Sequence, residues 1–270
     1  MQGVSRSSFA ALRERLAEEV PGPVVAEMLG DELFAVLRVL DREHALRRAL
    51  SDPAKHARQK EEVASALFGG RVAPATEELI TAAVSSRWAS PSDLADAVEH
   101  LAVEALVMVA EAEGRLDDLE DELFRFGRLV AAQPDLRAAL SGPTLPAERK
   151  RGLLDALLAD KVTPVTLRLI TEMAVHPRGR ALQHSLDLAA RIAAQRRERL
   201  IAVVRVAAPL PARQRDRLTA ALSQHYHRDV HLNVVLDPAI LGGMTVQVGD
   251  ELIDGSVASR LAAVRRRLAG

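Results

Sequence analysis

The sequence contains no cysteine, which excludes disulfides and thiolate metal sites and fits a reducing compartment. Aromatic residues make up only 3% of the chain, which leaves few rings on which nucleic acid bases could stack. The apolar runs fall short of the roughly 20 residues that a membrane-spanning helix needs, and the N-terminal stretch lacks the apolar core of a secretory signal. With 48% hydrophobic residues and a net charge of −1, the chain is expected to be a soluble globular protein.

Motifs for catalysis and ligand binding are missing as well. The glycine pairs at 69–70 and 242–243 lack the Lys-Ser/Thr that holds phosphate and magnesium in a P-loop, and no serine lies in a Gly-x-Ser-x-Gly turn. One histidine cluster lacks the i, i+4 spacing of a zinc-binding helix; its members are His225, His227 and His231. The sequence therefore predicts no catalytic residue, no cofactor-binding residue and no metal site.

The sequence repeats itself with an offset of 90 residues. The tetrapeptide DELF occurs at Asp31–Phe34 and again at Asp121–Phe124, and Lys60 and Lys150 recur in the same register. Residues 31–81 and 121–171 are identical at 21 of 51 positions without a gap. Composition can explain matched leucines but not matched prolines in one register, so we interpret this region as a duplicated helical unit.

Local signals predict where the helices begin and where the helical pattern stops. Pro74 and Pro164 are expected in first turns, where the missing N–H has no intrahelical partner, and Thr163 is expected to cap its helix. Residues 93–112 show a one-sided apolar stripe of helical period. After about Arg199 the pattern changes to a strand, a basic amphipathic helix and further strands.

These patterns predict a mainly α N-terminal helical bundle with an internal repeat, plus a small C-terminal α/β domain. We place a helical repeat unit at 1–97, a second helical domain at 98–198 and the α/β domain at 199–270. The C-terminal domain contains a segment rich in turn residues, which predicts a strand end, a bend or a positive φ, a hairpin turn and a capped strand-to-helix corner. Its nine structural residues are Asp237, Pro238, Gly242, Gly243, Gly249, Asp250, Asp254, Gly255 and Ser256.

This turn-rich segment contains the motifs Asp-Pro, Gly-Gly, Gly-Asp and Asp-Gly-Ser in that order. It thereby resembles the C-terminal pattern of the delta subunit of bacterial F-type ATP synthase. This family also includes the mitochondrial oligomycin-sensitivity-conferring protein. Stretches of the middle region, such as LRAALSGPTLPAERKRGLLDALL, resemble the helical domain of the same family. The resemblance covers about residues 98–270. The preceding residues copy most of the helical domain, as in the longer actinobacterial form of the subunit.

The resemblance implies a non-catalytic peripheral-stalk (stator) subunit, present in one copy per complex and without a cofactor. Its helical part is expected to bind the N-terminal segments of alpha subunits. Its C-terminal domain is expected to bind the C-terminal ends of the membrane-anchored b subunits. The resemblance also implies a location at the cytoplasmic side of the cell membrane, to which the chain is bound through the complex. No binding of nucleic acid is expected.

Two alternatives come from other classes of protein. One is a helical-repeat adaptor unrelated to ATP synthase, which would bind neither alpha nor b subunits. The other is an RNA-binding α/β protein that uses the basic C-terminal part, where residues 199–270 carry 10 basic and 6 acidic side chains. Such binding would weaken steeply with salt.

Overall fold

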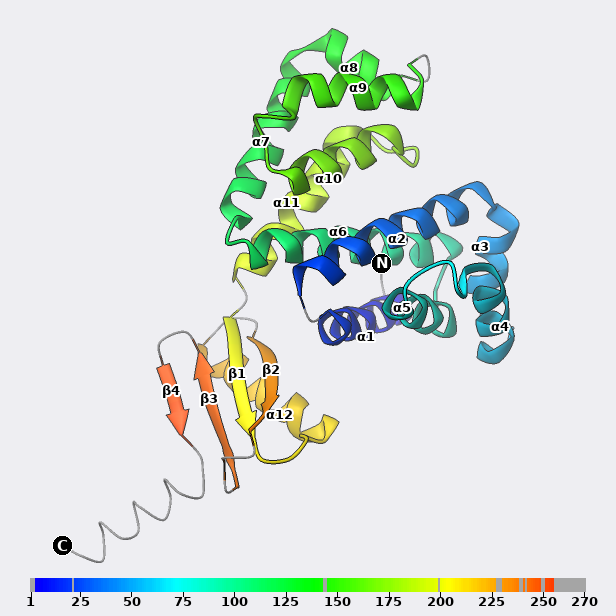
Figure 1. Cartoon of the computed structure of the whole chain (residues 1–270). Coiled ribbons are helices and arrows are strands. Elements are labelled where there is room, and N and C mark those ends of the chain that lie inside the picture. The colour runs from blue at the N-terminus through cyan, green and yellow to red at the C-terminus, as the bar shows by residue number, and fades with distance from the viewer. Residues whose placement is uncertain are drawn as a thin grey trace, which may run out of the picture. The chain divides into compact units, whose positions relative to one another are not determined.

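A computed structural model describes most of the chain, and its contacts divide the protein into two compact units, Met1–Ala194 and Gln195–Gly270. The described residues are 3–20, 22–142, 145–198, 200–226, 230–237, 240, 242–248 and 251–254. They form twelve helices and four strands, shown in Figure 1. The predicted fold class, a helical region followed by a small α/β domain, is confirmed.

In its described residues the first unit contains helices joined by loops, and its last helix continues four residues beyond Ala194. Its first five helices are α1 (Val4–Glu19), α2 (Pro23–Arg42), α3 (His44–Ser51), α4 (Ala57–Phe68) and α5 (Pro74–Ser85). The next six are α6 (Pro91–Ala112), α7 (Leu116–Ala132), α8 (Pro134–Ser141), α9 (Ala147–Leu158), α10 (Pro164–Val175) and α11 (Leu182–Glu198).

The 90-residue repeat is visible in the helix bounds. Helices α8, α9 and α10 each begin and end 90 residues after α3, α4 and α5, respectively. Helices α2 and α7, which carry the two DELF motifs, occupy the same place in the order. The predicted helix starts are also confirmed: Pro74 and Pro164 lie in first turns, and the Thr163 side chain accepts a hydrogen bond from the Thr166 N–H.

Helix α6 lies at the centre of the helical unit and connects the two repeats. It is buried on nearly all sides, including positions outside the predicted stripe such as Ala95, Val103 and Val107. The predicted stripe is buried as expected, and the rest of the helix is buried as well because helices of both repeats pack around α6. Residues 97 and 98, where we divided the two helical domains, lie within this continuous helix. The buried apolar side chains from Leu12 to Ala193 form one cluster.

Close packing of α2 against α6 depends on Gly30. A Cβ atom added at Gly30 would lie 2.8 Å from a methyl carbon of Leu106 and 3.3 Å from the carbonyl oxygen of Ala102. Both neighbours are fully buried, so neither can move without disturbing the core. The glycine is therefore required for the close approach of these two helices, and not for an unusual φ.

Replacing Gly30 with valine is expected to lower the free energy of unfolding by about 1–3 kcal/mol, the usual cost of overpacking a core. Gly152 in α9 is the matched control, because a Cβ added there would meet no atom within 4 Å. Gly152→Ala is expected to stabilise the protein by about 0.5–1 kcal/mol. Thermal and urea unfolding of the two variants measure both effects; a neutral Gly30→Val would contradict the close packing.

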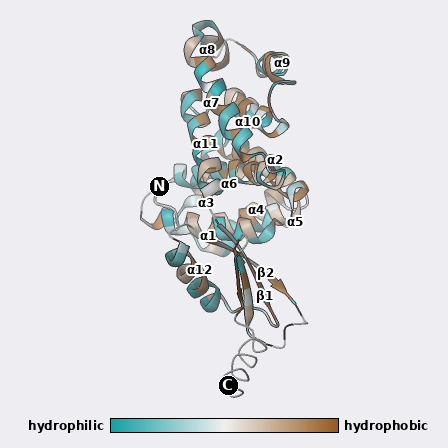
Figure 2. Ribbon diagram, turned by 90° about the vertical axis from the view of Figure 1, so that its left-hand side faces the viewer, coloured by the Kyte–Doolittle hydropathy of each residue, from teal (hydrophilic) through white to brown (hydrophobic). Residues whose placement is uncertain are grey.

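The second unit contains a four-stranded mixed sheet with strand order β2-β1-β3-β4. Strand β1 (Leu200–Val206) pairs parallel with β2 (Val230–Leu236) and antiparallel with β3 (Met244–Val248), which pairs antiparallel with β4 (Glu251–Asp254). Helix α12 (Ala212–Tyr226) connects β1 to β2 and packs Leu218 and Leu222 into the sheet's apolar core. Figure 2 shows the strongly hydrophobic character of β1 and β2.

Candidate functional site

The repeat preserves a polar contact as well as a helix pattern. The carboxylate of Glu32, from the first DELF, accepts hydrogen bonds from the Ala73 backbone N–H at 3.0 and 3.1 Å. The carboxylate of Glu122, from the second DELF, accepts the same bonds from the Thr163 N–H at the same distances. Each glutamate thereby binds the start of the helix that begins with proline, and negative charge there is favoured by the helix dipole.

A buried lysine is the second duplicated polar group. Lys60 donates to the carbonyl of Ser86, and Lys150 donates to the carbonyl of Ala174, each at 3.4 Å. Both lysines are buried. Burial lowers the pKa of Lys60, and the nearby carboxylates of Asp52 and Glu61 oppose that shift. These lysines join helices within each repeat, so the motifs that revealed the duplication are structural.

Ion pairs between α2 and α10 join the two repeats. Arg168 donates to the carboxylate of Asp31 at 2.6 Å and also pairs with Glu27. Arg38 donates to the carboxylate of Glu172 at 2.7 Å. The charge changes sign once along each helix, from acidic to basic on α2 and from basic to acidic on α10, so the pairs fix the register of the two helices. Because these side chains are partly exposed, the pairs contribute more to this register than to stability.

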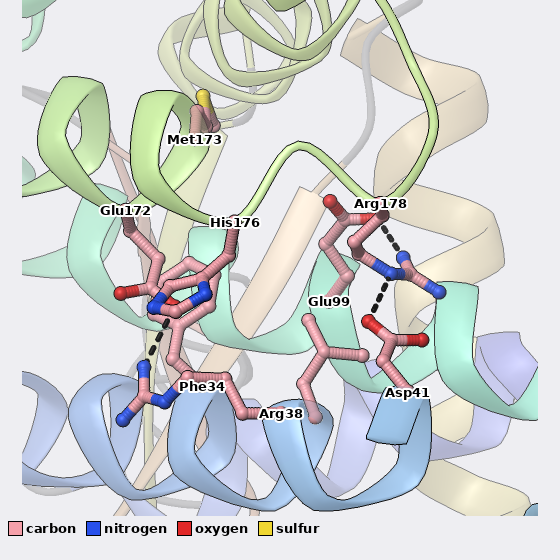
Figure 3. A pocket seen from close by; sticks show the side chains of 9 residues that line it. Phe34, Arg38, Asp41, Glu99, Glu172, Met173, His176 and Arg178 are labelled. Carbon is pink, nitrogen blue, oxygen red and sulfur yellow. Dashed lines mark hydrogen bonds and ion pairs between the residues drawn. The ribbon is translucent and has the colours of Figure 1, made fainter. Parts of the chain in front are cut away.

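Arg178 forms the most buried ion pairs between the repeats. Its guanidinium donates to Asp41 at 2.7 Å, lies 3.2 Å from a carboxylate oxygen of Asp96 and pairs with Glu99, which Arg180 also contacts. Figure 3 shows Arg178 reaching Asp41 from α2 and Glu99 from α6. The loop between α10 and α11 is thereby tied to both helices.

Two features of Arg178 show how strongly its surroundings hold it. Its φ of 52° lies in the left-handed region, which is uncommon for a residue other than glycine. Burial lowers the pKa of Arg178, but the charges of Glu99, Asp41 and Asp96 more than offset this effect, so the pKa lies above its ordinary value. The arginine therefore stays charged, and the ion pairs compensate for the backbone strain.

A small cavity beside this cluster is lined by Phe34, Met173 and His176 (Figure 3). The Nε2 atom of His176 is buried and makes no hydrogen bond within the described part of the chain. Burial lowers the pKa of His176, and Glu172 and Arg38 act on it in opposite directions. The carboxylates and guanidinium groups around the cavity pair with one another, so the arrangement stiffens the contact between the repeats.

The structure describes part of the predicted C-terminal segment. Gly242 and Gly243 have φ angles of 147° and 82°, so both have the positive φ that the sequence predicts. Asp237 follows β2, and its N–H donates to the carbonyl of Val206 at 2.9 Å. Asp254 ends β4, whose first residue Glu251 lies opposite Val248 in the hairpin. Pro238, Gly249, Asp250, Gly255 and Ser256 lie outside the described residues, so their predicted roles remain predictions.

Within the described residues, no group of three or more histidine, aspartate or glutamate side chains is placed to hold a metal ion. In the same part of the chain, no helix is both long and apolar enough to cross a membrane.

The sequence did not reveal the cluster around Arg178. Its members come from α2, α6 and the loop after α10, and no spacing in the sequence relates them. The loop sequence Pro-Arg-Gly-Arg at 177–180 was the one available signal, because two arginines next to a glycine indicate a charged turn.

The chain matches known proteins along its full length. The family profile described as "ATP synthase delta (OSCP) subunit" matches residues 102–268. Proteins named ATP synthase subunit delta are similar to all of it: that of Thermobifida fusca is 48% identical over 270 residues, that of Streptomyces griseus 48% over 271 and that of Acidothermus cellulolyticus 49% over 273. In each case the match covers 100% of both chains.

Similar solved structures include a chain of the Toxoplasma gondii mitochondrial ATP synthase hexamer. The match covers 62% of this chain and 95% of that chain, at 20% identity and a TM-score of 0.28. At that TM-score the likeness adds no weight to the sequence comparisons.

Proposed function

The chain belongs to the ATP synthase delta (OSCP) subunit family and is a component of the peripheral stalk, and we propose that it acts as a non-catalytic connector within that stalk. In this role the helical unit binds the N-terminal segments of alpha subunits, and the C-terminal unit binds the C-terminal ends of the b subunits. One copy then serves each complex at the cytoplasmic side of the cell membrane. The helix-packing of the repeats carries this proposal, because a stator transmits torque through a stiff body.

Stiffness of the helical unit is supported by its single apolar cluster and by the ion pairs across the repeats. The buried side chains of both repeats belong to one cluster, so neither repeat has a core of its own that could move independently. Arg178 adds charged contacts from one loop to two helices. Such a unit deforms little under load.

Docking of the C-terminal unit is supported by apolar side chains that its described strands leave exposed. Val235 and Leu236 lie at the end of β2, and Leu252 and Ile253 lie on the edge strand β4. Both are edge strands of the described sheet, and an edge strand offers unpaired backbone groups to a partner beside its exposed apolar side chains. The ends of b subunits are the partners that the family assignment favours for these two edges of the sheet.

The test is chemical cross-linking of the full chain with peptides from the two partners. Peptides of the alpha N-terminus are expected to link to residues within Met1–Ala194, and peptides of the b C-terminus to residues within Gln195–Gly270. Mass spectrometry of the linked fragments identifies the sites. If b peptides link to the helical unit and alpha peptides to the C-terminal unit, the proposed polarity is reversed and this part of the proposal fails.

A further inference from the structure

The two copies of the DELF phenylalanine have opposite exposure. Phe34 in α2 is 4% exposed, whereas Phe124 in α7 is 62% exposed. The two residues are 90 positions apart and occupy the same place in the two repeats. Single exposed apolar residues are common, so this difference becomes informative only through the charged residues around each phenylalanine.

Helix α2 shows what covers the phenylalanine in the first repeat. Glu27, Asp31, Phe34 and Arg38 follow one another at steps of four, three and four, so they lie along one side of the helix. Helix α10 covers this side with ion pairs and brings an apolar side chain to it. Arg168 meets the two acidic groups, Glu172 meets Arg38, and Met173 lines the small cavity together with Phe34.

Helix α7 repeats the same side with the same chemistry. The counterparts are Asp117, Asp121, Phe124 and Arg128, which we call the α7 face. All four side chains are exposed. Asp121 pairs with Arg125 in the same helix, and the Arg128 guanidinium carbon lies 6.0 Å from the centre of the Phe124 ring.

The covered side of α7 is next to this face. Helix α11 comes close at Gly127, where an added Cβ would lie 2.9 Å from Nε2 of Gln183. Phe124 lies outside this contact and stays exposed. The side of α2 that a helix covers in the first repeat is therefore exposed on α7 in the second repeat. Terminal units of repeat arrays likewise lack a neighbour on one side.

We propose that the α7 face is a docking surface for a helix of a partner protein that has the chemistry of α10. That helix carries a cation to meet Asp117 and Asp121, an anion four residues later to meet Arg128, and an apolar side chain to pack on Phe124. The occupant comes from another protein because the chain's own α10 already covers α2. This inference goes beyond the proposed function and does not depend on which subunit supplies the helix.

Phe124 supplies most of the binding in this arrangement, and the charges set direction and register. Exposed ion pairs contribute little affinity, whereas a buried aromatic anchor typically dominates an interface. Along α7 the acidic residues come before Arg128. A helix that carries a cation followed by an anion can therefore pair with this face in one orientation only.

The probe is a labelled synthetic peptide of residues 164–178, held helical by a hydrocarbon link on its outer face. Fluorescence anisotropy with the full chain is expected to show saturable binding. Phe124→Ala is expected to weaken this binding at least about tenfold, the effect of losing an interface anchor. Arg128→Glu weakens it too, and a peptide in which Glu172 is replaced by arginine restores binding to that variant but not to the unmodified chain.

Val63 is the matched control, because it is 42% exposed but lies on α4. Val63→Ala is expected to leave binding unchanged, and thermal unfolding confirms that the exposed-site variants remain folded. The proposal is overturned if the peptide does not bind, or if Phe124→Ala and Arg128→Glu leave its binding unchanged. It is also overturned if sedimentation shows a dimer of the chain that Phe124→Ala dissociates, because a second copy is then the occupant.

Discussion

Arg178→Ala is expected to lower the free energy of unfolding of the helical unit by about 3 kcal/mol. The substitution leaves Glu99 buried with one cationic partner fewer, and it removes the contacts from the loop to Asp41 and Asp96. The cost falls at the low end for a broken buried ion pair because Arg180 still contacts Glu99. Urea unfolding monitored by circular dichroism measures the effect.

Two further variants test the origin of that cost. Arg178→Ala combined with Glu99→Gln is expected to recover part of the loss, because the buried Glu99 charge, which Arg180 alone would then balance, is removed. Arg58→Ala is the control, since Arg58 pairs with Glu62 at the surface and its loss is expected to cost less than about 1 kcal/mol. Equal losses for Arg178→Ala and Arg58→Ala would contradict the importance of the buried cluster.

Gly243→Val is expected to destabilise the C-terminal unit by about 1–3 kcal/mol, because a β-branched residue is strained at a φ of 82°. The strain acts between β2 and β3, so we expect weaker binding of b-subunit peptides as well. The catalytic head is expected to hydrolyse ATP as before, since the proposed connector contributes no catalytic group. Peptide binding and hydrolysis by the detached head are measured in parallel.

Gly70→Val is the matched control for Gly243→Val. Gly70 has a φ of 67° and lies in the helical unit, so valine there imposes similar strain in the other part of the chain. Binding of b peptides is expected to be preserved in Gly70→Val and reduced in Gly243→Val. A loss of b binding in Gly70→Val alone would show that the helical unit holds the b subunits.

Helix positions could be predicted from the sequence because their signals are local. Prolines at first turns, the Thr163 cap and the DELF register act within a few residues, and α4 and α9 begin and end where the repeat requires. Only part of the strand pairing in the C-terminal unit could be predicted from such local signals. The hairpin of β3 and β4 is local, whereas the parallel pairing of β1 with β2 depends on α12.

Contacts between the repeats could not be predicted because they join residues far apart in the sequence. The α6 stripe predicted one buried side, but residues outside the stripe are buried too, because helices of both repeats contact α6 and no local pattern reveals them. The left-handed φ of Arg178 likewise occurs where its side chain pairs with Asp41 and Glu99, which lie on α2 and α6, far from Arg178 in the sequence. Periodicity in the sequence identifies one buried face of a helix, whereas the number of faces that are buried depends on the tertiary fold.

Neither alternative class of protein is supported. The match to ATP synthase delta subunits covers the whole chain, including the repeated N-terminal part, so an unrelated helical adaptor does not explain it. The same match includes residues 199–270, whose basic excess had suggested RNA binding. That part of the chain is therefore similar to delta subunits as well.

We propose that this chain couples the catalytic head to the membrane without taking part in catalysis. ATP-driven proton pumping by membranes stripped of this chain and of the head, then reconstituted with the head alone or with head and chain, tests it most directly. We predict that pumping requires the chain, while the soluble head hydrolyses ATP at the same rate with or without it. Equal pumping in both reconstitutions, or hydrolysis by the soluble head that depends on the chain, would contradict the claim.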